Sequence, residues 1–336
     1  MKRLLLTVLA AAVCMCAMPL SAGAENVNLT YSNFFPPTHI QSKLAQQWCD
    51  EVAKRTDGRV TISYFPGNTL TKAKQCYDGV VEGLSDIGMS ALAYSRGRFP
   101  TMAAVDLPLG YKSGVAATKV ANAVYEKFQP KELRQVKVIF FHAHGPGLLF
   151  TAKKPVRTLE DIKGMKLRGT GNSAQLLKAL GASPVAMSMP DSYQAIRKGV
   201  VDGGVYPMET NKGWKMGEVV DYCTLDYPVG YTTTFFVVMN KDKWAAISEE
   251  DQKTIMALGQ EYALKHAKAW DESDKVGREF LTEKGGQFIE LSEAEGKRWK
   301  DKAAPMMDEY VKMANSKKLD GKAILDFTVE TLNSAQ

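Results

Sequence analysis

The first part of the chain alternates between two hydrophobic patterns. Residues 27–32 (VNLTYS) and 59–65 (RVTISYF) alternate apolar and polar positions, as strands do, whereas residues 42–56 between them carry apolar side chains at helical spacing. Gly58 and Gly67 mark the turns after the helix and the second strand. The pattern continues with a predicted helix at 71–82, an apolar run at 85–94, a helix at 114–127 and a strand at 136–145. Strands that alternate with helices predict an α/β fold with parallel strands.

The middle of the chain repeats this organisation. Its predicted elements are an apolar run at 148–154, a helix start at Thr158 and Asp161, a short strand at 165–168, and helices at 173–180 and 191–198. Residues 232–240 (TTTFFVVMN) then form a continuous apolar run. Such a run predicts a strand that is buried on both faces.

The last third is predicted to be mostly helical. Capping boxes at Ser248 with Asp251 and at Ser292 with Glu295 mark two helix starts. Apolar and aromatic residues follow the first box at helical spacing as far as Phe280. This helix, which we call the spine helix, is long enough to run along two domains.

The N-terminus has the features of a secretory signal peptide. Lys2 and Arg3 precede an apolar run at 4–20 and four small residues that end at Ala24, so we expect residues 1–24 to be a signal peptide cleaved after Ala24. Neither Cys14 nor Cys16 follows a small residue, so lipid attachment is not expected. The remaining 312 residues (336 minus 24) suggest two domains, and the absence of a linker indicates that the backbone crosses between them more than once.

Charge and cysteine content exclude some function classes. Loss of Lys2 and Arg3 takes the formal charge from +6 to +4, and the basic residues are scattered among acidic ones, so no nucleic-acid partner is expected. Cys49, Cys76 and Cys223 remain after cleavage, at spacings that match no zinc site. A Cys49–Cys76 disulfide and three buried thiols are both open.

Arg168 is the candidate binding residue. It ends the predicted strand 165–168 and precedes a glycine-bracketed turn that leads into a helix. Ligands of open α/β sheets bind at the carboxyl ends of strands, and helix N-termini favour anions. An arginine fork also matches a carboxylate bidentately. The sequence therefore suggests a carboxylate site, although a solvated surface arginine fits the spacing equally well.

No catalytic or metal motif is recognisable. His142 and His144 share one face of a strand but lack a third ligand, so we interpret them as packing or rim residues. Gly169 and Gly171 lack the remaining residues of a nucleotide-binding loop, and no cofactor is expected.

A secreted enzyme that acts on acidic substrates is the rival interpretation. It would need a general base near Arg168, such as Asp191, Asp202 or His144.

Aromatic residues form a second group of candidates. Several fall at strand ends or in the turns that follow, where ligand-facing residues are expected: Phe34, Phe35, Tyr94, Tyr206, Trp214 and Tyr231. For any one of them, ordinary rim packing is the alternative.

Longer stretches resemble a known family. Residues 155–207 contain DIKGMKLR, ALGASPVAM, DSYQAI and KGVVDGGVYP, and the earlier stretch AKRTDGRVTISYFPGNTL has a similar counterpart. Together they resemble the DctP-type extracytoplasmic solute-binding proteins of TRAP transporters over essentially the whole mature chain.

The resemblance implies a fold like that of type II periplasmic binding proteins. Two α/β lobes would be joined by crossover hinge strands and the spine helix, with residues 25–145 and 233–272 in lobe I and residues 146–232 and 273–336 in lobe II. The implied protein is periplasmic, is not an enzyme, and acts, we expect as a monomer, by capturing a small organic acid for the membrane permease. Presentation of the ligand to a receptor instead of a permease stays open.

The resemblance also assigns the site. Arg168 occupies the position of the arginine that clamps the ligand carboxylate, whereas Leu148 stands where sialic-acid-type members have a second arginine and Tyr206 replaces a frequent asparagine. Both replacements favour a monocarboxylate with an apolar or aromatic body. The expected ligand-binding residues are Arg168, Tyr206, Met189, Phe34, Phe35, Trp214, Leu148 and Ser90, and Tyr206, Trp214, Phe34 and Phe35 are expected to stack on the ligand.

Overall fold

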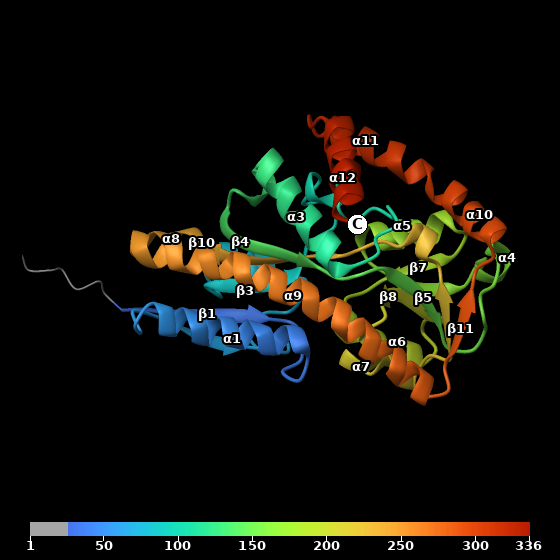
Figure 1. Ribbon diagram of the computed structural model, residues 1–336, viewed down its shortest axis with the longest axis horizontal. Helices are drawn as coiled ribbons and strands as arrows, with labels where there is room; N and C mark the ends of the chain where they lie inside the picture. The colour runs from blue at the N-terminus through green and yellow to red at the C-terminus, as the bar shows by residue number, and fades with distance from the viewer. Residues whose placement is uncertain (1–25) are drawn as a thin grey trace, which may run out of the picture.

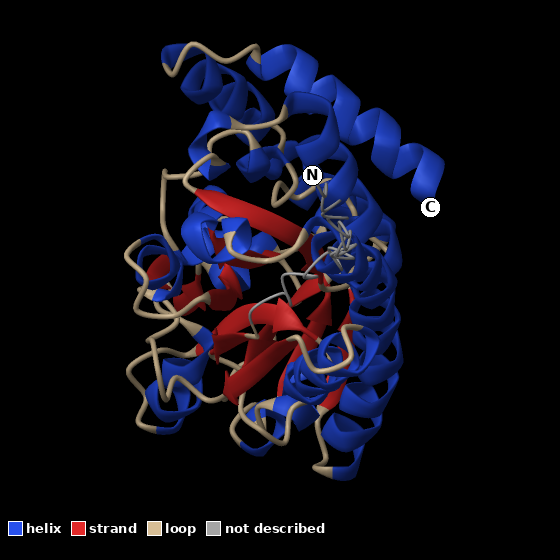
Figure 2. Ribbon diagram, turned by 90° about the vertical axis from the view of Figure 1, so that its left-hand side faces the viewer, coloured by secondary structure: helices blue, strands red, loops and turns tan. Residues whose placement is uncertain are grey.

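The structure is a computed structural model that describes residues 26–336. The predicted signal peptide and its cleavage site lie outside the described residues. Within residues 26–336, no helix combines the length and the apolar character that crossing a bilayer requires. Figure 2 shows the strands in the interior of the molecule with the helices around them.

The first of two sheets has the strand order β2-β1-β3-β10-β4. Its strands are β1 (Val27–Asn33), β2 (Val60–Phe65), β3 (Ile87–Ala91), β4 (Val136–Ala143) and β10 (Thr234–Asn240). β1 pairs in parallel with β2 and β3, whereas β10 runs antiparallel to β3 and β4. β10 is buried along all but its last residue, which confirms the predicted doubly buried strand.

The second sheet has the strand order β11-β9-β5-β8-β6-β7. Its strands are β5 (Gly147–Thr151), β6 (Lys166–Gly169), β7 (Ser183–Ala186), β8 (Gly203–Pro207), β9 (Tyr222–Leu225) and β11 (Gln287–Glu290). β6 is parallel to both of its neighbours, but β5 runs antiparallel to β8 and β9. The prediction of parallel sheets is therefore wrong for β10 and β5.

The reversed direction of these two strands follows from the hinge between the sheets. β4 ends at Ala143 and β5 begins at Gly147, so the chain passes from one sheet into the other without a helix between. The return crossing before β10 lies beside it, because Gly147 N–H donates to Tyr231 O at 2.8 Å. A helix crossover within one sheet makes the next strand parallel to the previous one. Strands β5 and β10 instead enter from the neighbouring sheet, and both run antiparallel to the strands beside them.

The helices lie largely where the hydrophobic periodicity predicts them. Their bounds are α1 (Ile40–Arg55), α2 (Cys76–Val81), α3 (Gly114–Phe128), α4 (Leu159–Ile162), α5 (Gly171–Ala179), α6 (Met189–Arg197), α7 (Thr210–Gly213), α8 (Lys241–Ala245), α9 (Glu249–Glu283), α10 (Glu293–Ala303), α11 (Pro305–Ser316) and α12 (Gly321–Ala335). Short 3-10 turns are η1 (Leu92–Tyr94), η2 (Met102–Ala104), η3 (Lys131–Leu133), η4 (Met216–Glu218) and η5 (Tyr227–Val229).

Helix α2 is shorter than predicted. The predicted helix 71–82 forms only over Cys76–Val81. Thr71 N–H donates instead to the side-chain oxygen of Ser32 in β1, at 3.1 Å. This tertiary bond holds the segment before α2 against the sheet, where its backbone cannot close a helical turn.

The spine helix is α9, which is 35 residues long. Ser248 caps its N-terminus by accepting a hydrogen bond from Asp251 N–H at 3.2 Å. Figure 1 shows α9 running past α1 and β4 at one end and past α7 at the other, so it spans both sheets. The exact division of the chain between the lobes remains a prediction. Helix α12, near the C-terminus, lies against α3.

The three cysteines of the described chain are buried free thiols. Burial raises the pKa of Cys76 to about 12, so this thiol stays protonated at neutral pH. Of the two open interpretations, the structure has three buried thiols and no Cys49–Cys76 disulfide.

Gly277 lets α9 approach the segment after β8 closely, which leads to a prediction. A Cβ atom at this position would lie 2.1 Å from Met208 O and 2.7 Å from the Glu209 Cα. Both are backbone atoms that cannot rotate away, so we expect Gly277→Ala to lower the free energy of unfolding by about 1–3 kcal/mol, despite alanine's higher helix propensity. Val276→Ala, at an exposed neighbouring position, serves as the control and should change it by less than about 0.5 kcal/mol. Urea denaturation would measure both, and a Gly277→Ala protein as stable as wild type would show that this contact is not tight.

Candidate functional site

Arg168 is buried at the carboxyl end of β6, with 4 % of its surface exposed. Its Nε donates to Met187 O at 3.1 Å and its Nη1 donates to Val205 O at 3.0 Å. The helix that follows packs closely on this strand end, because a Cβ at Gly169 would lie 2.9 Å from the Ala174 Cα. Two backbone carbonyls therefore fix the guanidinium, and the alternative of a solvated surface arginine is wrong.

The charge of Arg168 lacks a protein counter-ion. Within residues 26–336 no acidic side chain forms an ion pair with it; the two carbonyls described above accept its hydrogen bonds, and the neutral Tyr94 hydroxyl lies beside it. Burying a cation without an anionic partner costs free energy that carbonyl dipoles offset only in part. A carboxylate that reaches the remaining N–H groups would therefore be held strongly.

Tyrosine hydroxyls surround the guanidinium. Burial raises the pKa values of Tyr94, Tyr206 and Tyr231, and the Arg168 charge partly opposes this in each case. Tyr94 Oη accepts a hydrogen bond from Met189 N–H at 3.1 Å. The Tyr206 hydroxyl, in contrast, is buried without a hydrogen-bond partner. An unpaired buried hydroxyl is costly, so this group is free to bond to a ligand.

Tyr231 reaches the site only because residue 147 is glycine. A Cβ at Gly147 would lie 2.4 Å or less from two carbons of the Tyr231 ring. Any other residue at this point of the hinge would push the ring away from the second sheet.

Aromatic rings form the opposite wall. Phe34 directly follows β1 in the first sheet, whereas Trp214 directly follows α7 beyond the second sheet. Their rings are nearly parallel, at 18° with the centroids 6.0 Å apart, and Phe34 also stacks on Phe235 at 6.2 Å. The wall is thus shared between segments that belong to different sheets.

These groups enclose a small cavity of about 30 Å³. Its lining residues are Phe34, Phe35, Tyr94, His144, Arg168, Thr170, Met189, Tyr206, Pro207, Glu209, Thr210, Trp214, Tyr231, Thr233, Phe235 and Trp270. A single water needs about 10–15 Å³ by this measure, so the space fits only two or three waters. An organic acid can enter only if the walls move apart.

Six of the eight predicted site residues line this cavity: Arg168, Tyr206, Met189, Phe34, Phe35 and Trp214. Ser90 and Leu148 do not. The Ser90 hydroxyl donates to Ala73 O at 2.7 Å inside the first sheet, and Leu148 is packed in the core as the register partner of Tyr206 in β8. Local packing already satisfies both side chains, so their predicted contact with the ligand has no support from this cavity and stays a prediction.

The stacking role predicted for Tyr206 needs revision. One face of its ring is already stacked on Phe150, with the centroids 4.4 Å apart and the planes at 4°. Its position beside Arg168 and its unpaired hydroxyl point to hydrogen bonding as its contribution.

Sequence reasoning missed several residues of the cavity. Phe235 and Trp270 carry only the signal of core residues, since they lie in a buried strand and in the spine helix. Glu209 is buried and pairs with His39, whose Nε2 lies 3.2 Å from a carboxylate oxygen. No sequence spacing links residues 39 and 209, so only the tertiary structure reveals this pair.

All four histidines of the chain are buried. The interpretation of His142 as a packing residue is confirmed, because its Nδ1 accepts a hydrogen bond from Trp270 Nε1 at 3.0 Å and its ring stacks on His266 at 4.5 Å. Burial lowers the pKa of His144 to about 4 and that of His266 to about 3. No cluster of three potential metal ligands occurs within the described part of the chain.

Two of the three bases named for the rival enzyme lie outside the cavity. Asp191 accepts a hydrogen bond from Ser188 Oγ at 2.7 Å and Asp202 accepts one from Lys166 N–H at 2.8 Å, and neither lines the cavity. His144 does line it, and its Nδ1 lies against the carbonyl oxygen of Gly145.

Comparison with known proteins agrees with this geometry. Residues 31–313 match the family described as bacterial extracellular solute-binding protein, family 7. A TRAP periplasmic solute-binding protein from Bordetella bronchiseptica, solved with bound (R)- and (S)-mandelate, is 31% identical with a TM-score of 0.86, over 92% of this chain and 100% of that one.

Two further relatives show the breadth of the group. A marine metagenome TRAP solute-binding protein specific for aromatic acids, solved with metahydroxyphenylacetate, is 28% identical with a TM-score of 0.88, over 92% of this chain and 99% of that one. The C4-dicarboxylate-binding periplasmic protein DctP of Rhodobacter capsulatus is 26% identical, over 92% of this chain and 93% of that one.

The lowered pKa of His144 leads to a pH prediction. An unfolded histidine titrates near 6.5, so the stability that neutral His144 contributes is complete above pH 6.5 and is lost as the pH falls toward 4. The stability difference between wild type and His144→Gln should therefore shift against wild type by about 2–3 kcal/mol between pH 7.5 and pH 4.5. Urea denaturation at both pH values would measure it. The subtraction removes the opposite effect of Asp106 and Asp226, whose pKa values burial raises to about 7. A pH-independent difference would show that His144 is not desolvated.

Proposed function

Because the chain belongs to family 7 of the bacterial extracellular solute-binding proteins, we propose that it captures a monocarboxylate with an apolar or aromatic body. Proteins of this family are periplasmic and bind organic acids for a TRAP membrane permease; they are not enzymes. The finer proposal concerns the ligand and the residues that hold it.

The buried guanidinium of Arg168, which lacks an anionic protein partner, carries the proposal. It is also the only lysine or arginine among the residues that line the cavity within residues 26–336. A second carboxylate on the ligand would lose its hydration without gaining a cation, so a dicarboxylate is disfavoured. The cavity can therefore neutralise one carboxylate on the ligand.

The remaining walls support an aromatic or apolar body. Phe34, Phe35 and Phe235 supply ring surface without hydrogen-bonding groups, and Trp214 and Trp270 add indole rings, of which the Trp270 N–H already bonds to His142. A sugar acid would leave several hydroxyls unpaired against these rings, at a cost of about 1–3 kcal/mol each. The mandelate-bound and aromatic-acid-specific relatives are consistent with this choice.

We propose that binding couples to movement of the two lobes. The acid would enter while they are apart, meet Arg168 and Tyr206 on one side, and then be covered by Phe34 and Phe35 from the other. Closure removes water from the ion pair and thereby strengthens it. The ligand bridges both lobes only in the closed form, so it shifts the population toward that form. One chain supplies the whole cavity, which supports action as a monomer.

A ligand screen tests the proposed class directly. Refolded protein should show its largest rise in melting temperature with aromatic monocarboxylates such as mandelate or benzoate, because a ligand bound only by the native state stabilises it. C4-dicarboxylates and hexonates provide the contrast. A larger shift with either of these would reject the proposed ligand class while leaving the family assignment intact.

Removal of the guanidinium should abolish tight binding. With Arg168→Ala we expect affinity for the best ligand of the screen to fall by at least about 100-fold, since a charge-assisted pair in a dry site is lost. The fold should persist, because the substitution also removes an unpaired buried charge. Isothermal titration calorimetry would measure the loss, with the exposed Arg157→Ala as a matched control. Unchanged affinity in Arg168→Ala would rule out the clamp.

Tyr206→Phe separates a hydroxyl contact from ring packing. If the hydroxyl bonds to the ligand acid group, affinity should fall about tenfold for aromatic and aliphatic acids alike. Stability of the ligand-free protein should rise slightly, because an unpaired buried hydroxyl is removed. Calorimetry and thermal unfolding would report the two effects. An undiminished affinity in Tyr206→Phe, with a loss confined to Tyr206→Ala and to aromatic acids, would instead restore the stacking role.

A further inference from the structure

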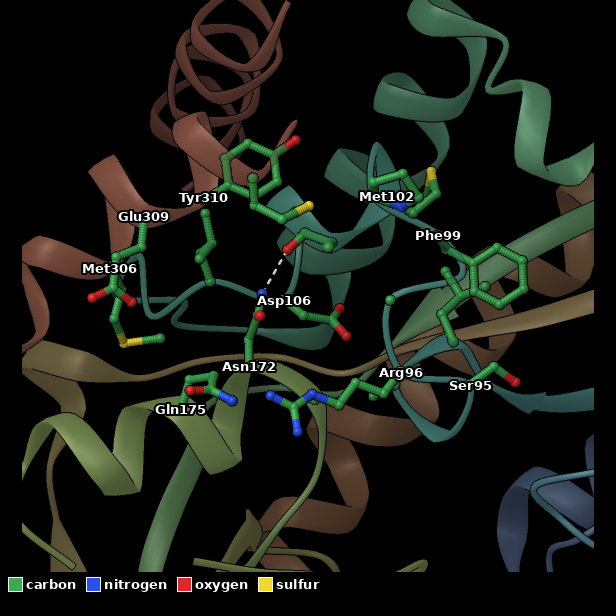
Figure 3. A pocket seen from close by; sticks show the side chains of 18 of the residues that line it. Ser95, Arg96, Phe99, Met102, Asp106, Asn172, Gln175, Met306, Glu309 and Tyr310 are labelled. Carbon is green, nitrogen blue, oxygen red and sulfur yellow. Dashed lines mark hydrogen bonds between the residues drawn. The ribbon is translucent and has the colours of Figure 1, made fainter. Parts of the chain in front are cut away.

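A second and larger cavity lies beside the Arg168 site. Its volume is about 270 Å³, close to the lower end of the range for small-molecule sites, about 300 Å³. Three separate segments of the chain form its walls: residues 92–107, the start of α5 and helix α11. Figure 3 shows them facing one another, with Phe99 and Met102 on one side and Met306 and Tyr310 on another. The proposed function does not use this cavity.

Two of its ionisable groups are incompletely paired. Asp106 is buried, and its Oδ1 accepts hydrogen bonds from Thr234 N–H at 2.9 Å and from Thr234 Oγ1 at 2.8 Å, whereas its Oδ2 has no such partner. Arg96 is an exposed residue of the cavity lining, and it makes no hydrogen bond or ion pair with the rest of the described chain. Figure 3 shows its guanidinium reaching toward Gln175.

The other walls are apolar and adaptable. Met102, Met306 and Met313 contribute flexible thioethers, and Phe99 and Tyr310 contribute rings. Methionine side chains reshape around different apolar bodies at little cost. Such a surface accepts an apolar group without selecting one shape.

The charge balance selects the ligand's head group. The lining contains two basic residues, Arg96 and Lys317, and two acidic residues, Asp106 and Glu309. Lys317 Nζ already donates to Gly97 O at 2.8 Å, whereas Arg96 has no partner within the described residues. Burial raises the pKa of Asp106 to about 7, which reduces the negative charge beside Arg96. Asp106, when protonated, can also donate a hydrogen bond to an anion.

We propose that this cavity is a second site, for a small organic anion with an apolar body. The anion would pair with Arg96 and Gln175 and place its body against the methionines. This inference is independent of the ligand assigned to the Arg168 site, because no residue lines both cavities.

The second site shares a wall with the first. Ala93 and Gly171 line the larger cavity, whereas their chain neighbours Tyr94 and Thr170 line the smaller one. The contact between the two segments is close, since a Cβ at Gly171 would lie 3.0 Å from the Ala93 Cβ. Asn172 Nδ2 also donates to Ala103 O at 2.7 Å across the same junction. An occupant of the second site would therefore lie beside the contact between two segments that also line the first.

The test uses phenylacetate as the probe and the full-length mature Arg168→Ala protein, in which the first site lacks its cation. We expect saturable binding at one site by NMR titration of the protein. Arg96→Gln in this background should weaken it about tenfold, and Met313→Trp, at a partly exposed wall position, should fill the cavity and abolish it. Lys119→Gln, which removes an exposed charge from α3, is the matched control and should leave the affinity unchanged.

Three outcomes would overturn the proposal. They are the absence of saturable binding, binding that neither Arg96→Gln nor Met313→Trp alters, and binding that Lys119→Gln weakens as much as Arg96→Gln does. Calorimetry on proteins that keep Arg168 separates this result from the proposed function. When Arg168 is present, the Met313→Trp variant should still bind the acid at the Arg168 site. Only the loss of affinity caused by Arg168→Ala reports on the first site.

Discussion

A buried guanidinium without a counter-ion is the constraint on which the site depends. Arg168 is held by two backbone carbonyls that orient it but do not neutralise it. The folded protein therefore carries an unfavourable electrostatic term that only an anion from outside can relieve. In the proposed function this term explains why the ligand must carry an acid group, and Arg168, the one lysine or arginine lining the cavity within residues 26–336, explains why one such group is enough.

The proposed opening and closing of the space around that charge depends on the rest of the architecture. The link between β4 and β5 and the segment before β10 connect the two sheets side by side, and they would form the joint about which the lobes move. Phe34 and Trp214 approach each other from opposite sides of it. Helix α9 crosses as well, and its tight contact at Gly277 fixes the segment that carries Trp214. In the proposed mechanism, closure would assemble the aromatic wall and exclude water from the ion pair in the same step.

Ionisable groups in the interior oppose one another in their dependence on pH. The buried histidines contribute stability above pH 6.5 that is lost in acid, since burial lowers the pKa values of His144 and His266. Asp106 and Asp226 behave in the opposite way, because burial raises their pKa values to about 7 and their contribution falls as the pH rises from 3.8 toward that value. Between about pH 4 and pH 6.5 the two trends therefore offset each other in part.

The sequence alone determined the local elements and one decisive residue. Periodicity and capping located β10, α1 and α9, because these depend on neighbours a few positions away. The strand-turn-helix setting of Arg168 likewise suggested an anion site from nearby residues, although the spacing fitted a solvated arginine equally well. The length of α2 and the direction of β5 were decided by the tertiary structure, since the hydrogen bond from Thr71 N–H to Ser32 Oγ and the crossing between the sheets join distant parts of the chain. The same holds for the cavity, because its composition depends on which side chains meet after folding. Examples are the unpaired Tyr206 hydroxyl, the Glu209–His39 pair, and the positions of Ser90 and Leu148 away from the cavity. Local spacing cannot encode those encounters, because each joins residues far apart along the chain.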